Sequence, residues 1–186
     1  MSGGTKKDMA VMELDELSFR KVLPYLTPDI ILVTNLYRDS FSRNANPDFI
    51  FNVMSHYVSP KTTLVLNADD LISCRLAPQD ANRVYYSIGR LADDTAEPQG
   101  IVCDLTACPV CGGKLEYDYC HLRHLGHATC KSCGFTNPEP DYELTALDRE
   151  AHTFTVCERS HEGAPTHTYR YGNSSITNLY NLFSTV

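Results

Sequence analysis

Four cysteines are spaced as metal ligands. Cys108 and Cys111 lie in "CPVCGG", and Cys130 and Cys133 lie in "CKSCGF". A CxxC turn can direct two sulfurs at one ion, and structural zinc commonly takes four thiolates in a tetrahedron. The two turns therefore predict one structural Zn²⁺ bound by all four cysteines. Because the protein fills the coordination shell, the site would not hold a reactive water.

The alternative is that these cysteines form disulfides or stay as free thiols. The segment Met1–Leu14 has no signal-peptide pattern, so we expect a cytoplasmic protein whose thiols stay reduced. No apolar stretch approaches the roughly 18 residues of a membrane span. The formal charge of -7 and the mixed charges of Cys103–Phe135 argue against a nucleic-acid partner.

Three histidines follow the first cysteine pair: His121, His124 and His127. They could form a second metal site, but we favour packing or solvent-facing roles because four thiolates already complete the zinc shell. Tyr117 and Tyr119 alternate in "LEYDY", a spacing more typical of one face of a ribbon strand than of base stacking.

The chain around the cysteines predicts an α/β fold with a mostly parallel sheet. Apolar runs predict strands that alternate with helical patterns, which is typical of βαβ units. The expected strands are 8–14, 29–35, 61–70 and 83–89, and the expected helices are 15–26, 47–58 and 70–77. Beyond Phe135 we expect antiparallel strands at 142–147, 152–158 and 166–172, then a closing helix.

This pattern divides the chain into three parts. Residues 1–100 form the first part of the α/β domain, 101–137 form a zinc-ribbon insertion, and 138–186 form the remainder of the domain. The sheet has its own apolar strands, whereas so small a ribbon needs its metal to fold.

Polar clusters end three of the predicted elements, at 13–16, 34–39 and 67–70. Open α/β sheets bind ligands at the carboxyl ends of their strands, so these carboxylates could hold Mg²⁺ near a nucleotide. Alternatively, Asp15, Asp69 and Asp70 could each cap a helix. The residue types alone leave both interpretations open.

The order of several motifs resembles the central ATPase domain of the Mur ligase family. The motifs are "AVMELDE", "ILVTNLYRDSFSR", "TLVLNADD" and "NLYNLFS". The four-cysteine ribbon after "NADD", followed by "CGFTNPEPDYEL", is similar to the MurT type, the ligase-like subunit of lipid II isoglutaminyl synthase. The resemblance implies ATP and Mg²⁺ as cofactors, lipid II as substrate and a glutaminase subunit as partner.

The resemblance also implies roles for single residues. Glu13 would coordinate Mg²⁺, and Asn35, Arg38 and Asp39 would line the phosphate and metal region. Ser40 stands where the family has His or Gln. Asn178 and Asn181 would contact the adenine end of ATP, and their spacing places both on one helix face. Without the resemblance, that pair would equally suit a polar helix surface.

The sequence has no GxxxxGK[ST] motif, the loop that holds nucleotide phosphates. In the family this loop lies upstream of the first matching strand, and a further domain follows the last matching helix. We therefore expect the parent protein to be an ATP-dependent amide ligase and this chain alone to be inactive. The alternative is a non-catalytic zinc-ribbon adaptor on a degenerate Mur-ligase scaffold.

Overall fold

The computed structural model describes residues 8–36, 47–99, 105, 107–172 and 176–185. The helical elements are the 3₁₀ turns η1 (Glu16–Ser18) and η2 (Ser73–Arg75), and the helices α1 (Phe19–Val22), α2 (Pro47–Tyr57) and α3 (Ile176–Phe183). The strands are β1 (Ile30–Val33), β2 (Thr63–Asn67), β3 (Arg83–Ile88), β4 (Leu115–Leu122), β5 (Leu125–Cys130), β6 (Tyr142–Asp148), β7 (Thr153–Glu158) and β8 (Thr166–Arg170). Among the described residues, no helix is long and apolar enough to cross a membrane.

One six-stranded sheet, in the order β1-β2-β3-β6-β7-β8, forms the body of the molecule. The pairs β1–β2, β2–β3 and β3–β6 are parallel, and the pairs β6–β7 and β7–β8 are antiparallel. The mixed sheet confirms the expected α/β class, with a parallel part followed by an antiparallel part.

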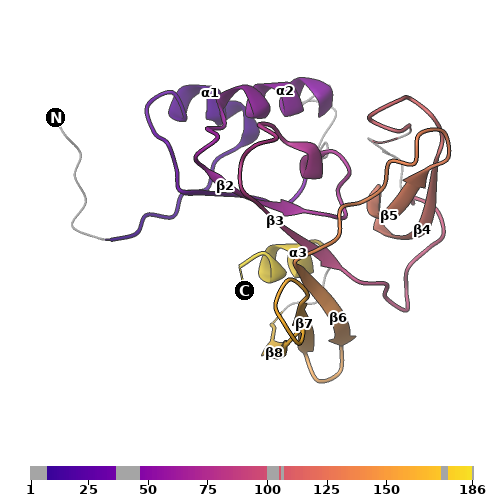
Figure 1. The fold of residues 1–186 in the computed structure, drawn as a ribbon. Helices are drawn as coiled ribbons and strands as arrows, with labels where there is room; N and C mark the ends of the chain where they lie inside the picture. The colour runs from indigo at the N-terminus through magenta and orange to yellow at the C-terminus, as the bar shows by residue number, and fades with distance from the viewer. Residues whose placement is uncertain (1–7, 37–46, 100–104, 106, 173–175, 186) are drawn as a thin grey trace.

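Each face of this sheet has its own apolar core. On one face, Ile31 and Val33 of β1 and Leu64 and Leu66 of β2 pack with residues of α1 and α2. On the other face, α3 covers Tyr86, Ile88, Leu144 and neighbouring residues. Figure 1 shows α1 and α2 on one side of the sheet and α3 on the opposite side. The carboxyl ends of β2 and β3 are thereby fixed between helices from both ends of the chain.

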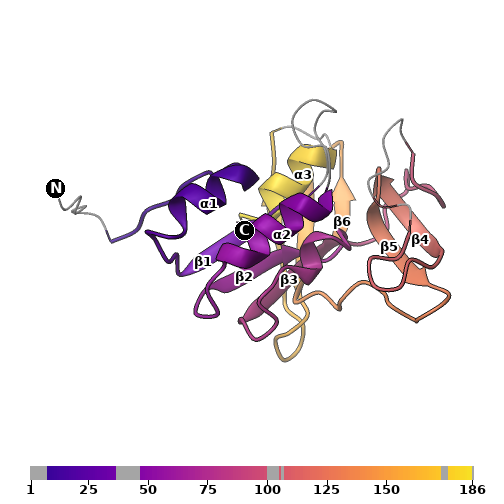
Figure 2. The same ribbon diagram turned by 90° about the horizontal axis from the view of Figure 1, so that it is seen from above.

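The ribbon is a separate two-stranded antiparallel sheet, β4–β5, placed in the connection between the parallel neighbours β3 and β6. Parallel strands need a crossover connection of about a dozen residues or more, and that connection is usually a helix. Here the ribbon takes this place. Figure 2 shows it beyond the ends of β2 and β3, on the side away from the N-terminus.

Three expectations need correction: the strand at 8–14 and the helices at 15–26 and 70–77, the last of which is only the 3₁₀ turn η2. The predicted buried strand Asp8–Leu14 is not a strand, and its apolar side chains Met9 and Val11 are 78% and 89% exposed. Its apolar run looks like a strand by periodicity, but pairing and burial must come from the fold, and neither occurs here. The predicted helix 15–26 is shorter, because η1 and α1 end at Val22, ahead of Pro24.

Candidate functional site

The four predicted metal ligands converge. The sulfurs of Cys108, Cys111, Cys130 and Cys133 all lie within 4.8 Å of one another. The Sγ–Sγ distance is 3.7 Å between Cys108 and Cys133, and 3.5 Å between Cys111 and Cys130. A tetrahedron with Zn–S bonds of about 2.3 Å has sulfurs roughly 3.8 Å apart, so these cysteines fit a zinc ion.

The two cysteine turns have the same local geometry. Gly112 and Gly134, each just after the second cysteine of its pair, have φ angles of 73° and 74°, which glycine adopts without strain. Their N–H groups donate to the carbonyls of Cys108 and Cys130, 2.9 Å away in both cases. The N–H of Gly113 also points at Sγ of Cys111, at 3.4 Å. Backbone donors of this kind stabilise thiolates.

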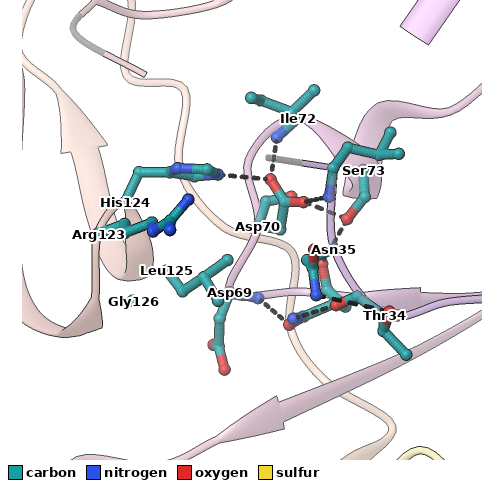
Figure 3. Close-up of polar contacts among 12 residues, drawn as sticks. Thr34, Asn35, Asp69, Asp70, Ile72, Ser73, Arg123, His124, Leu125 and Gly126 are labelled. Atoms are coloured by element: carbon teal, nitrogen blue, oxygen red, sulfur yellow. Dashed lines mark hydrogen bonds and ion pairs between the residues drawn. The ribbon is translucent and has the colours of Figure 1, made fainter. Parts of the chain in front are cut away.

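Asp70 joins the end of β2 to the ribbon. Its Oδ1 accepts from Nε2 of His124 at 3.2 Å and from the N–H of Ile72 at 2.9 Å (Figure 3). Its Oδ2 accepts from the N–H of Leu36 at 2.6 Å. Both the Asp70 and the His124 side chains are fully buried. Asp70 thus serves as a local turn cap and as a link between distant segments, rather than as an exposed Mg²⁺ ligand.

A second link comes from the segment after the ribbon. The Asn137 side chain donates to the carbonyls of Ala68 and Gly126, at 2.6 and 2.9 Å, and accepts from the N–H of Ala128. The N–H of Gly126 donates to the carbonyl of Asp69 at 3.0 Å. The ribbon is therefore tied to the end of β2 through both side-chain and backbone groups.

Asp69 and Asp70 are adjacent in the sequence but have opposite electrostatic surroundings. Burial raises the pKa of Asp69 to about 6. The charge of His121 and the hydrogen bonds from the Ile88 N–H and the Tyr180 hydroxyl lower this pKa, but by less than burial raises it. Burial also acts on Asp70, but the hydrogen bond and charge of His124 and the backbone donors outweigh it, so its pKa is lowered. The two carboxylates therefore respond differently to pH.

All three ribbon histidines pair with aspartates, which the sequence pattern does not indicate. His121 Nδ1 lies 2.6 Å from Oδ1 of Asp94, and its Nε2 lies 2.9 Å from the carbonyl of Ile88. His127 Nδ1 lies 2.6 Å from Oδ2 of Asp118, on a more exposed surface. The partners of His121 and His124 lie in the α/β domain, far away in the sequence. The clustering of the three histidines is therefore the only sequence signal that they act together.

The residues expected to bind nucleotide and Mg²⁺ are less closely grouped. Asn35 follows β1 and lies 3.5 Å from the Thr34 hydroxyl, and Glu13 is exposed ahead of η1. Arg38 and Asp39, as well as Ser40, lie outside the described residues. Asn178 and Asn181 are both in α3, and Asn181 is exposed. Within the described part of the chain, no hydrogen bond joins Glu13, Asn35 and Asn181 to one another.

The aspartates left open between helix capping and Mg²⁺ binding differ in their roles. Asp15 caps η1, since its side chain accepts from the N–H of Ser18. Asp69 does not cap a helix: its Oδ2 accepts from the N–H of Ile88 at 2.7 Å and from the Tyr180 hydroxyl at 2.8 Å. Tyr180 belongs to α3, so this contact fixes the closing helix against the ends of β2 and β3.

The chain combines a largely parallel α/β sheet with a four-cysteine ribbon in its last parallel crossover. Its fold is similar to that of a solved structure, a pseudomurein peptide ligase type C from Methanothermus fervidus, with a TM-score of 0.63 and 25% identity, covering 84% of this chain and 29% of that one. No protein-family model matches the sequence.

Curated proteins of similar sequence are MurT subunits. The chain is 35% identical over 149 residues to the MurT subunit of lipid II isoglutaminyl synthase (glutamine-hydrolyzing) from Staphylococcus aureus, and 30% identical over 148 residues to that of Streptococcus pneumoniae. These matches cover 80% and 78% of this chain, and each covers 33% of the relative. They confirm the resemblance to MurT-type Mur ligases. The chain spans about one third of the length of the curated relatives that it matches.

Proposed function

We propose that this chain is the central-domain part of a MurT-like, ATP-dependent amide ligase that amidates the stem-peptide glutamate of lipid II in the cytoplasm. The single observation that carries the proposal is the 35% identity to MurT over 149 residues, supported by a peptide-ligase fold. The relatives are described as glutamine-hydrolyzing, which supports a glutaminase subunit as partner.

The reaction assigns separate tasks to the protein groups. ATP would supply the phosphoryl group that activates the substrate carboxylate, and ammonia would then replace phosphate to form the amide. Glu13, Asn35, Arg38 and Asp39 would hold the Mg²⁺ and phosphate charges, and Asn178 and Asn181 would hold the adenine. Phosphoryl transfer depends mainly on such positioning and charge stabilisation.

The four cysteines would bind a structural zinc ion that keeps the ribbon folded. The sulfur spacing and the backbone N–H donors support this role. The ribbon in turn contacts the β2 and β3 ends through Asp70, Asn137 and Asp69. Zinc would therefore stabilise the carboxyl ends of β2 and β3.

A chimera tests the proposal. The matching third of the Staphylococcus aureus MurT is replaced by this chain, and glutamine-dependent amidation of lipid II is measured with the glutaminase partner. We expect amidation that falls at least about 100-fold in Glu13→Gln, since charge clamps of this kind contribute several kcal/mol to catalysis. Glu97→Gln, which changes an acid in the loop after β3, is the matched control.

A folded chimera that binds zinc and the glutaminase but forms no amide would contradict the enzyme assignment. That result would favour the second candidate, a zinc-ribbon adaptor, for which the four-cysteine cluster is the supporting observation.

A further inference from the structure

A cleft lies where the ribbon meets the sheet. Its volume is about 270 Å³, and it is lined by the end of β2, by β3 and β6, and by β4 and β5 of the ribbon. The segment Asn137–Pro140 borders it as well. Ligands of open α/β sheets commonly bind at the carboxyl ends of strands, which is where this cleft lies.

Two buried polar groups that line the cleft lack a partner within the described chain. Ser87 is 6% exposed, and its hydroxyl makes no hydrogen bond to any described residue. Asp69 is 2% exposed; its Oδ2 takes both of its donors, whereas no described residue donates to its Oδ1. Figure 3 shows the Asp69 carboxylate pointing away from that of Asp70. Neither oxygen is among the described side-chain atoms that are both fully enclosed and without a partner, so each of these otherwise buried side chains presents an oxygen that can be reached from the cleft.

Glu143 adds a third acidic group to the same place. It is the register partner of Ser87 across β3–β6, so the two side chains lie side by side on one face of the sheet. Gly89, two residues after Ser87, makes room for the carboxylate: a Cβ at this position would lie 2.9 Å from Oε1 of Glu143. The close approach of Glu143 thus depends on glycine.

The charges around the cleft favour a cation. Asp69, Glu139 and Glu143 contribute carboxylates, and the one lining guanidinium, that of Arg159, is already paired with Oε2 of Glu143. Arg159 shows that a nitrogen cation can reach this carboxylate. Among the described residues, three or more Cys, His, Asp or Glu ligand atoms converge only at the four ribbon sulfurs, so the carboxylates of the cleft do not form a compact cluster of metal ligands.

The walls favour an organic cation with an alkyl chain. Tyr119 stacks on His127 with ring centroids 6.0 Å apart, and both rings line the cleft. Pro138 and Pro140 add apolar surface on the segment after the ribbon. An aromatic face and prolines suit methylene groups, while oxygen acceptors at the base suit N–H donors.

We propose that this cleft binds a primary alkylammonium group, such as that of a lysine side chain, with Ser87, Asp69 and Glu143 as the groups that recognise the ammonium. The site lies between the ribbon and the sheet, and it does not depend on ATP or on the proposed ligase reaction. The ammonium has three donors, which match the three acceptor groups.

The test is an NMR titration of the zinc-loaded 186-residue chain with Nα-acetyl-L-lysine amide. We expect saturable shifts at the amides of Ser87, Gly89 and Tyr119. The probe Nα-acetyl-L-norleucine amide, which has a similar chain without the ammonium, should cause no saturable shift. Butylammonium distinguishes a simple alkylammonium from a lysine residue. If it binds as tightly as Nα-acetyl-L-lysine amide, the cleft recognises any alkylammonium; if it binds more weakly, the cleft also recognises the lysine backbone.

Variants connect the shifts to the cleft. Ser87→Ala and Glu143→Gln should each weaken lysine-amide binding about 10-fold, as expected for loss of one hydrogen bond to a charged group. Ser87→Ala removes a hydroxyl that has no partner in the described chain, so the fold should be kept. Glu150→Gln, in the exposed turn after β6, is the control. Equal shifts with the norleucine probe, or unchanged affinity in both cleft variants, would overturn the proposal, as would Ca²⁺ binding at the same amides in preference to the amine.

Discussion

Oδ1 of Asp70 and Nε2 of His124 lie 3.2 Å apart, and both side chains are excluded from solvent. This contact joins the end of β2 to the ribbon across 54 residues of sequence. In the low dielectric of the interior such a pair interacts strongly, and removing either partner leaves a polar group buried without its complement. The stability of the α/β domain and that of the ribbon are therefore coupled at this point.

Disruption of this contact should destabilise the whole chain. His124→Gln should lower the free energy of unfolding by about 3 kcal/mol at pH 7, as measured by urea denaturation. His127→Gln is a matched control, because His127 makes the same kind of contact with Asp118 at a more exposed position. Exposed pairs contribute little, so this variant should cost less than about 1 kcal/mol. Equal losses of unfolding free energy in the two variants would show that burial does not make the Asp70–His124 contact more stabilising than an exposed one.

Zinc content should follow the four ribbon cysteines. We expect one zinc per chain by elemental analysis, and well below one in Cys111→Ser, because a structural site needs its full set of thiolates. Cys157→Ser changes a buried cysteine of β7 outside the ribbon and should keep the metal. A metal-free wild-type chain with four reactive ribbon thiols would refute the zinc assignment.

Removal of zinc should loosen more than the ribbon. Leu115, Ala128 and two of the ribbon cysteines belong to the same apolar core as α1 and α2. After chelation, hydrogen exchange should therefore accelerate throughout 108–137 and, more weakly, at the amides of Leu36 and Ile72, which donate to Asp70. Ile31 and Val33 should stay protected by the sheet. Loss of protection confined to the ribbon would show that the shared core is energetically minor.

Asp69 should make the chain less stable as the pH rises. Its pKa is raised by burial from 3.8 to about 6, so the folded state binds a proton more tightly than the unfolded state does. The free energy of unfolding should therefore fall between about pH 4 and pH 6, by roughly 3 kcal/mol from this group, and then level off.

Asp69→Asn removes the titration while keeping an acceptor for the Ile88 N–H. Urea denaturation at each pH measures the free energy of unfolding. From pH 4 to pH 6.5 it should fall less in this variant than in the wild type. Asp93→Asn, on the surface, is the control for loss of one carboxylate. An unchanged pH difference in Asp69→Asn would mean that Asp69 ionises as readily in the fold as in the unfolded chain.

Patterns confined to short segments could be predicted from the sequence. The two CxxC turns and the apolar strands of the sheet are local signals, and the structure confirms the cysteine cluster and the sheet. The Asp8–Leu14 prediction was wrong because a short apolar run does not reveal whether a neighbouring strand exists. The Asp70–His124 and Asn137–Ala68 contacts join residues 54 and 69 positions apart, so no spacing rule could indicate them.

Nucleotide affinity should be weak in this chain alone. The proposed adenine residues, Asn178 and Asn181, lie in α3, but the sequence has no loop motif to supply the backbone N–H groups and the lysine that hold β- and γ-phosphates. Charge-assisted phosphate contacts contribute several kcal/mol together, so adenine contacts alone should give a Kd on the order of millimolar. Isothermal titration with Mg-ATP measures it, and Asn178→Ala with Asn181→Ala should abolish the remaining binding. The exposed Asn82→Ala, in the loop before β3, is the control. A micromolar Kd that survives the double substitution would place the nucleotide site elsewhere in the chain.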